Sequence, residues 1–95
     1  MREAPLAITA VRLDSLQTTI LRSLYARSER RQSVAALARE VFPGADAYPD
    51  AELMGFVMPR LRRMRELEFV RLERLGAERA ASISLKGIEF VEQFA

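Results

Sequence analysis

The chain has 95 residues, which is enough for one domain near the size at which a single hydrophobic core is stable without disulfides or metal ions. Hydrophobic residues make up 49% and charged residues 29%, as in globular proteins, and no apolar run is long enough to cross a bilayer. The first residues lack the features of a secretory signal, so we expect a cytoplasmic protein. Cysteine and histidine are absent, which excludes disulfides, thiolate nucleophiles, imidazole bases and the commonest zinc ligands. We therefore expect neither an enzyme nor a cofactor or metal site.

Positive charge is concentrated in the second half of the chain. The net charge of +2 is small, although the isoelectric point is near 9.7. Residues 60–79 contain seven arginines and four glutamates, whereas the charged residues of 40–58 are acidic. Lys86 is the only lysine, and arginine suits bidentate phosphate contacts better than lysine does. A positive surface formed by residues 60–79 would favour nucleic acid, but a GC-rich genome also explains the preference for arginine.

The first 13 residues carry Leu6, Ile8, Val11 and Leu13 in loose alternation before the first clear helix signal. This pattern predicts a short strand or an extended N-terminal arm. The arm would pack either on a second subunit or on the core of its own chain. The side chains of the arm that would make this contact are Leu6, Ile8 and Val11.

Two helices are expected to follow, each opened by a capping residue. Asp14, with Gln17 three residues later, predicts a capping box, and this helix should end near Ser28. Ser33 predicts the cap of a second helix, which Pro43 and the following glycine should end. The apolar residues at helical spacing are Leu16, Ile20 and Leu24 in the first helix and Leu37, Ala38 and Val41 in the second.

A third helix is predicted after the long connection Phe-Pro-Gly-Ala-Asp-Ala-Tyr-Pro at 42–49. Asp50 is the expected cap. Pro59 interrupts the pattern, and a proline inside a helix removes one hydrogen bond and clashes with the preceding turn. A kink or a break near Val57 and Met58 is therefore expected, and two short helices stay an alternative to one bent helix. The buried face would hold Leu53, Val57, Leu61, Met64 and Leu67.

Beyond Glu68 the apolar period changes from three or four residues to two. Val70 and Leu72 alternate with charged residues, and Ala81 and Ile83 alternate with serines. This predicts a two-stranded hairpin over about 69 to 85, with a turn at 76–79 and one buried side. Ser84 would then cap a last helix with an apolar stripe formed by Ile88, Val91 and Phe94.

Two phrases in this region resemble the winged-helix DNA-binding domains of bacterial transcription regulators, in the broad manner of the MarR and PadR groups. Residues 64–70 read Met-Arg-Glu-Leu-Glu-Phe-Val, and residues 83–87 read Ile-Ser-Leu-Lys-Gly. Glu68 stands where those families usually have glycine, so the helix exit is expected to differ locally. The resemblance covers about residues 14 to 94. It implies an α+β, mostly α, fold: one domain over 1–95 with a three-helix bundle, a hairpin wing, a C-terminal helix and the arm at 1–13.

The resemblance also implies that the third helix enters the major groove of double-stranded DNA while the wing contacts the backbone. On this hypothesis the chain is a small transcription regulator that acts as a homodimer through its terminal segments. The arginines expected to contact DNA are Arg60, Arg62, Arg63, Arg71, Arg74 and Arg79.

The start of the third helix does not suit base recognition. Asp50 and Glu52 would be repelled by phosphates, and no Asn, Gln or Arg lies between them and Met58. The alternative hypothesis is a protein-interaction module that binds a protein partner through residues 48–58, without sequence-specific DNA binding. The apolar residues assigned to a dimer or partner contact are Leu6, Ile8, Val11, Met54, Phe56, Ile88, Val91 and Phe94.

Overall fold

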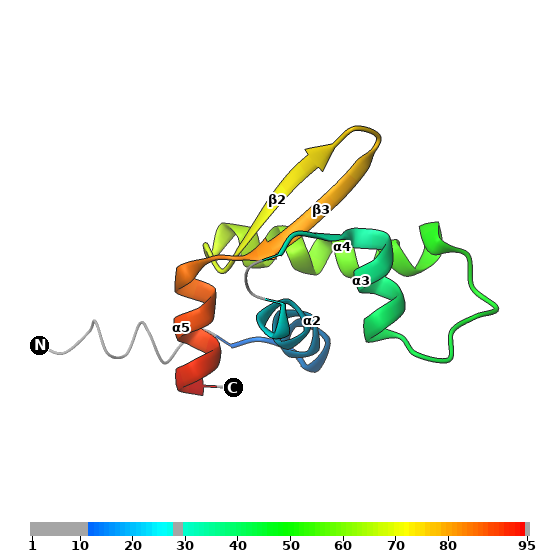
Figure 1. Cartoon of the computed structure of the whole chain (residues 1–95). Coiled ribbons are helices and arrows are strands. Elements are labelled where there is room, and N and C mark those ends of the chain that lie inside the picture. The colour runs from blue at the N-terminus through cyan, green and yellow to red at the C-terminus, as the bar shows by residue number, and fades with distance from the viewer. Residues whose placement is uncertain (1–11, 28–29, 95) are drawn as a thin grey trace, which may run out of the picture.

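The computed structural model describes residues 12–27 and 30–94, so the apolar residues of the arm (Leu6, Ile8 and Val11) lie outside the described part of the chain. Three helices form a bundle, a long hairpin extends from it, and a last helix closes the chain (Figure 1). No described helix is both long and apolar enough to span a membrane. The elements are α2 (Ser15–Ala26), β1 (Gln32–Ser33), α3 (Val34–Val41), α4 (Asp50–Glu66), β2 (Val70–Leu75), β3 (Glu78–Ile83) and α5 (Leu85–Phe94).

One hydrophobic core lies between the three helices and the base of the hairpin. Helices α2, α3 and α4 each contribute a stripe at the predicted spacing, and the alternating residues of β2 and β3 close the core from the other side. The predicted helix faces and the predicted buried side of the hairpin are therefore confirmed. The fully buried members with the largest side chains are Ile20, Leu21, Leu24, Val34, Leu37, Val57, Leu61 and Met64.

Helix α2 opens with the capping box that the sequence predicts. The Asp14 carboxylate accepts a hydrogen bond from the backbone N–H of Gln17 at 2.6 Å, and the Gln17 side chain accepts one from the N–H of Asp14 at 2.8 Å. The helix ends at Ala26, with Arg27 as its C-cap. Arg27 and the Gln32 amide both bond to Glu40 and lower the pKa of that carboxyl, so the end of α2, β1 and α3 are joined by one polar contact.

The connection between α3 and α4 is held by a single arginine. Arg39 donates to the carbonyl oxygens of Ala45 (2.8 Å) and Tyr48 (2.6 Å) and forms an ion pair with Asp50 at 2.8 Å. The prediction that Asp50 caps α4 is wrong: Pro49 is the N-cap, and Asp50 is the first residue of the helix. Its carboxylate meets Arg39 instead of the free N–H groups of the helix.

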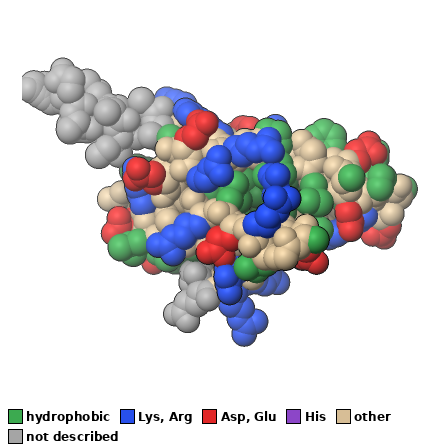
Figure 2. Space-filling model, turned by 90° about the horizontal axis from the view of Figure 1, so that it is seen from above, with side chains coloured by type: hydrophobic (Ala, Val, Ile, Leu, Met, Phe, Trp, Pro, Cys, Tyr) green, Lys and Arg blue, Asp and Glu red, His purple; other side chains and the backbone are tan. Residues whose placement is uncertain are grey.

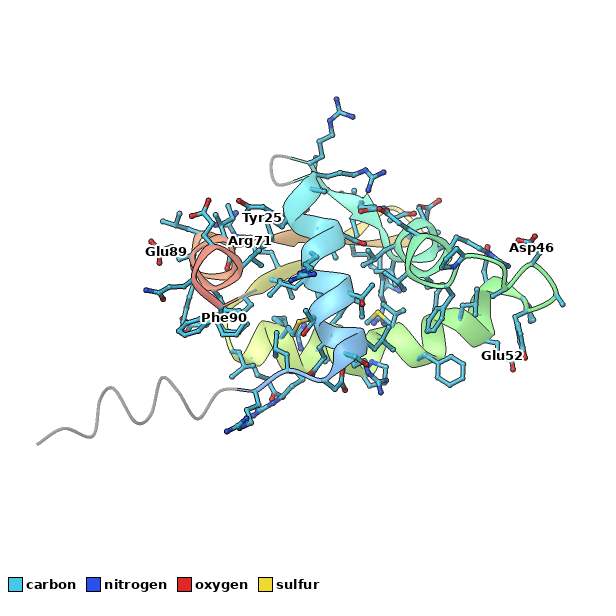
Figure 3. The ribbon with its side chains drawn as sticks, turned by 90° about the horizontal axis from the view of Figure 1, so that it is seen from below. Tyr25, Asp46, Glu52, Arg71, Glu89 and Phe90 are labelled. Carbon is cyan, nitrogen blue, oxygen red and sulfur yellow. The ribbon has the colours of Figure 1, made fainter. Side chains whose placement is uncertain are left out.

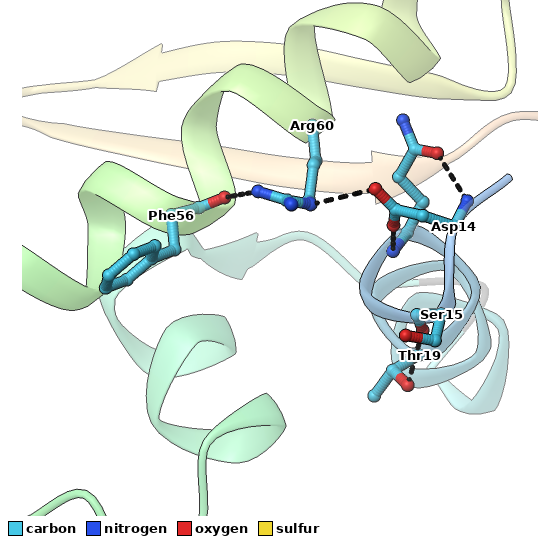
Figure 4. A network of polar contacts seen from close by, with 6 residues as sticks. Asp14, Ser15, Thr19, Phe56 and Arg60 are labelled. Atoms are coloured by element: carbon cyan, nitrogen blue, oxygen red, sulfur yellow. Dashed lines mark hydrogen bonds and ion pairs between the residues drawn. The ribbon is translucent and has the colours of Figure 1, made fainter.

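Helix α4 is continuous from Asp50 to Glu66, so the break expected near Val57 and Met58 and the two-helix alternative are wrong. The carbonyl that loses its partner belongs to Gly55, which is exposed and can bond water. Arg60 adds a second support, because its guanidinium donates to the carbonyl of Phe56 at 2.9 Å and to the Asp14 carboxylate at 3.2 Å (Figure 4). That side chain thus ties the proline-containing turn to the start of α2.

Glu68 provides the exit from α4, with a left-handed backbone at φ 68°. The N–H of Phe69 bonds to the carbonyl of Met64 and that of Glu68 to the carbonyl of Arg65, which is the hydrogen-bond pattern of a Schellman motif. Glycine usually occupies this position because it has no Cβ to clash. The expectation that this helix exit differs from that of the MarR and PadR groups is therefore wrong for the backbone. Glu68 adopts the conformation that glycine would adopt there.

A Glu68→Gly variant should be more stable than the parent by about 0.5 to 1 kcal/mol, because the left-handed strain is relieved while an exposed Lys86 contact of 3.6 Å is lost. Chemical denaturation measures the change. The matched control is Glu66→Gly in the last turn of the same helix, which should destabilise the protein by about 0.5 to 1 kcal/mol. Two variants that destabilise equally would contradict the assignment of strain to Glu68.

The hairpin belongs to a three-stranded antiparallel sheet with the order β1-β3-β2. The two-residue strand β1 was not predicted. Strand β3 pairs with it through Gln32 opposite Ala81, and with β2 through Leu72 opposite Ala81 and Arg74 opposite Arg79. One face of the hairpin therefore carries Leu72 and Ala81 at its base and the two arginines farther out. This face begins in the core and continues beyond it.

Ser84 caps α5 as predicted, by accepting a hydrogen bond from the N–H of Gly87 at 3.0 Å. Its hydroxyl donates to the carbonyl of Glu68, and its own N–H donates to the carbonyl of Phe69 at 2.9 Å. Gly87 lies directly against that Phe69 carbonyl. The phrase at 83–87 thus joins α5 to the exit of α4. Tyr25 adds a contact from α2, donating to Glu92 at 3.1 Å, and the neighbouring carboxylate raises the pKa of the tyrosine.

Candidate nucleic-acid interface

Four arginines from two elements line one open cleft of about 270 Å³ between α4 and the hairpin, which we call the arginine cleft. The space-filling view from above the hairpin shows Lys and Arg side chains gathered around the middle of this face, next to hydrophobic side chains (Figure 2). The remaining lining comes from Leu72 and Glu73. The four arginines are Arg62 and Arg65 from α4 and Arg74 and Arg79 from the hairpin.

The local structure explains why these four meet. Arg62 and Arg65 are three residues apart in α4, so they project from neighbouring positions of one face. Arg74 and Arg79 are direct cross-strand partners, so they project from the same face of the hairpin. Like charges directly opposite each other on a sheet destabilise it. A bound anion would remove that repulsion.

The arginine cleft keeps its positive charge because no described carboxylate neutralises these arginines. Within residues 12–27 and 30–94, none of the four forms an ion pair, and the Glu73 carboxylate at the rim is paired with Arg31 at 2.9 Å. Five other arginines of the described chain are held in ion pairs. These pairs are Arg27 with Glu40, Arg31 with Glu73, Arg39 with Asp50, Arg60 with Asp14, and Arg63 with Glu66.

An apolar surface adjoins the arginine cleft along α4. It borders a second hollow of about 410 Å³, and Arg62 and Arg79 line both spaces. Met54 is partly buried and Met58 is buried, whereas the other members are exposed. We call this surface the apolar shelf; it consists of Ala51, Met54, Gly55, Met58 and Pro59.

The arginines that the sequence assigned to DNA contact do not all lie together. Arg62, Arg74 and Arg79 line the arginine cleft, whereas Arg60 is bonded to Asp14 and Phe56 at the α2 side of α4. Arg63 pairs with Glu66 at 3.3 Å on the exposed side of that helix. Arg71 is exposed, but it is three residues from Arg74 and so projects from the other face of β2. The sequence analysis missed Arg65, although its spacing from Arg62 was a visible signal.

The first turns of α4 present less apolar surface than the sequence suggested. Phe56 is 49% exposed and packs against Phe42 with the rings tilted and their centroids 5.9 Å apart, but Met54 packs against the core and Met58 is 8% exposed. The Glu52 side chain is exposed, and its carboxylate forms no ion pair within the described residues. Figure 3 shows Glu52 near one end of the molecule, with Glu89 and Phe90 of α5 at the other and Arg71 towards the α5 side.

The C-terminal stripe is divided between the core and the surface. Val91 is 7% exposed and belongs to the core of its own chain, and Ile88 is partly buried against that core. Phe94 is 52% exposed, and its ring packs at a tilt against that of Phe90, with centroids 5.1 Å apart. Val91 is therefore not accessible to a second subunit in this conformation, whereas Phe94 is.

Comparison with solved structures agrees with this architecture. One match is the crystal structure of AF1382 from Archaeoglobus fulgidus, with a TM-score of 0.65 and 17% identity over 85% of this chain and 81% of that one. Another is the C30AH42A mutant of Lactococcus lactis ZitR, with a TM-score of 0.62 and 20% identity over 88% of this chain. The chain has a MarR-like winged-helix fold.

ZitR is described as a zinc-responsive member of the MarR family, and a second structure of it matches with a TM-score of 0.60 and 21% identity over 87% of this chain. The winged-helix chain described here spans about half (51%) of each ZitR chain. No protein-family model and no curated protein matches the sequence. The winged-helix fold identifies β2 and β3 as the wing and α3 and α4 as the helix-turn-helix pair.

Proposed function

We propose that the chain is a winged-helix transcription regulator that acts without enzymatic activity in the cytoplasm and contacts duplex DNA with α4 and the wing. The observation that carries this proposal is the arginine cleft, in which four arginines unpaired within the described chain come from the two elements that winged-helix proteins use on DNA. Guanidinium groups form bidentate contacts with phosphate, and such contacts supply most of the affinity for any DNA sequence. Arg65 joins Arg62, Arg74 and Arg79 as a proposed contact.

Sequence recognition is expected to be weak. Between Asp50 and Met58 the exposed positions of α4 hold Ala51, Glu52, Gly55 and Phe56, and none of these side chains makes the bidentate contacts that distinguish bases. Affinity then depends mainly on the phosphates. Fluorescence anisotropy of the parent protein with random duplex DNA over a salt series is the test. If the four cleft arginines contact phosphates, log affinity should fall with log salt with a slope of about −3.6. Affinity that does not change with salt would refute the proposal.

Replacing Glu52 by Gln should strengthen binding to every duplex alike. The carboxylate is exposed on the outer side of α4 without a partner in the described chain, so it opposes any approach of phosphates. At low salt we expect a gain of about two- to fivefold, which should shrink as the salt concentration rises. Anisotropy titrations of both proteins at two salt concentrations measure it. Equal affinities at low salt would show that α4 does not approach the DNA backbone at this position.

The candidate from another class is a protein-interaction module that uses residues 48–58. Tyr48 is 50% exposed and Phe56 is 49% exposed, and aromatic side chains of this kind are common in protein interfaces. If the parent protein does not bind DNA at low salt, this alternative is favoured. Phe56→Ser and Met54→Ser would then be the first variants to test for binding to a protein partner.

A homodimer through the terminal segments stays part of the proposed function. Phe94 and Leu85 of α5 are 52% and 67% exposed, and exposed apolar side chains at the end of a small domain favour association. The terminal residues assigned to this contact are Leu6, Ile8, Val11, Ile88, Val91 and Phe94, of which Val91 would have to act through the packing of α5. Sedimentation velocity at high micromolar concentration tests the dimer, and a monomer there would refute it.

A further inference from the structure

We propose that the arginine cleft and the apolar shelf together bind a free nucleoside polyphosphate, with the phosphate chain among the arginines and the base on the shelf. Four guanidinium groups line a space of about 270 Å³, and the Glu73 carboxylate that also lines it forms its ion pair with Arg31 rather than with any of the four. A triphosphate carries several negative charges on a chain whose size is comparable to that of the cleft. A ligand with a single carboxylate would leave most of the repulsion between the guanidinium groups uncompensated.

The surface next to the arginine cleft is apolar. The apolar shelf borders the hollow next to the arginine cleft, and Arg62 and Arg79 are shared between the two. Gly55 has no atom of a neighbouring element within 4 Å of where a Cβ would stand, so the surface of α4 is open there. A planar base can lie against methionine and proline side chains, and a guanidinium can stack on its face. A ligand with a phosphate chain attached to a flat ring therefore matches both halves.

The same chemistry occurs in a strand of nucleic acid, and the two sources are separated by using small probes without DNA. Free ATP and inorganic triphosphate are titrated into the full chain by isothermal calorimetry in low salt without divalent metal. Both should bind, and ATP should bind about tenfold more tightly because only ATP has a base to bury on the shelf. If ATP binds no more tightly than inorganic triphosphate, or neither binds the folded parent, the assignment fails.

Two variants test the two halves independently. Removing both wing charges with Arg74→Ala and Arg79→Ala should weaken both probes at least about tenfold, whereas Arg71→Ala, a loss of one charge on the other face of β2, should change affinity less than about twofold. Gly55→Gln places a neutral side chain on the shelf of an intact helix, so it should weaken ATP about fivefold and leave inorganic triphosphate unchanged. Equal losses from Arg71→Ala, or no preference of Gly55→Gln between the probes, would overturn the site.

A regulatory consequence rests on the proposed function. Because the same arginines would also contact the DNA backbone, ATP should displace a labelled duplex from the parent protein. ATP should displace the duplex less effectively from the Gly55→Gln variant. Calorimetric binding without any DNA binding would refute the proposed function and leave the nucleotide site standing. DNA binding that ATP does not displace, with no calorimetric signal, would refute the nucleotide site alone. Circular dichroism of each variant confirms that it is folded.

Discussion

A Gly87→Ala variant should lose about 2 to 4 kcal/mol of unfolding free energy. A Cβ at this position would overlap the carbonyl oxygen of Phe69 and lie 2.8 Å from Cγ1 of Ile83. Neither neighbour can move freely, because the Phe69 carbonyl accepts the N–H of Ser84 at 2.9 Å and Ile83 is buried in the core. Overpacking against fixed atoms costs about 1 to 3 kcal/mol, and distortion of the Ser84 hydrogen bond adds to it. In a domain of this size the melting temperature should fall by about 10 to 20 °C.

The control for this variant is Gly55→Ala, the same change in another helix. Gly55 lies inside α4, is exposed, and has no atom of a neighbouring element within 4 Å of the added Cβ. Alanine is the better helix former, so this variant should gain about 0.5 to 1 kcal/mol. Thermal and urea denaturation of both proteins give the comparison. A Gly87→Ala protein as stable as the parent would mean that α5 does not pack on the Phe69 carbonyl.

Periodicity predicted most of the fold because each core face is a local pattern. The spacing of Ile20 and Leu24 and the alternation of Val70 with Leu72 depend only on helix and strand geometry. The errors lie where a distant side chain decides the outcome. The Asp50 carboxylate forms an ion pair with Arg39 instead of capping α4. The turn that contains Pro59 is supported by Arg60, which is bonded to Asp14, 46 residues away. No local pattern shows either contact.

The candidate site was harder to predict because it depends on which faces meet. Charge density identified Arg62, Arg74 and Arg79, but the same density suggested Arg60, Arg63 and Arg71, which the structure places on other surfaces. Hairpin register separates Arg71 from Arg74, since residues three apart in a strand project to opposite faces. The predicted turn at 76–79 is wrong at its end, because only Gly76 and Ala77 lie between the strands and Arg79 belongs to β3, where it faces Arg74. That pairing creates the cleft, and only the register of β2 and β3 shows it.

Removing the facing pair should weaken DNA binding more than removing two arginines outside the arginine cleft. The Arg74→Ala, Arg79→Ala variant loses two proposed phosphate contacts, so the slope of log affinity against log salt should become shallower by about 1.8. At low salt the affinity should fall about tenfold for each arginine, by the same factor for every duplex sequence. Folding stability should stay equal or rise slightly, because the like charges opposed across the strands are removed. Anisotropy titrations on two unrelated duplexes, with urea denaturation of the same samples, measure all three quantities.

The matched control is the double variant Arg71→Ala, Arg63→Ala. It removes the same total charge as the Arg74→Ala, Arg79→Ala variant, one charge from the wing and one from α4, but leaves the arginine cleft unchanged. Long-range attraction to DNA falls equally in both double variants, so any difference between them reports direct contact. We expect the control to lose less than about threefold in affinity and to keep a slope within about 0.5 of the parent. If the control loses as much affinity for DNA as the Arg74→Ala, Arg79→Ala protein does, DNA binding depends only on net charge, and the arginine cleft makes no specific contact. A larger loss in the control would instead place the DNA on the opposite face of the wing, where Arg71 projects.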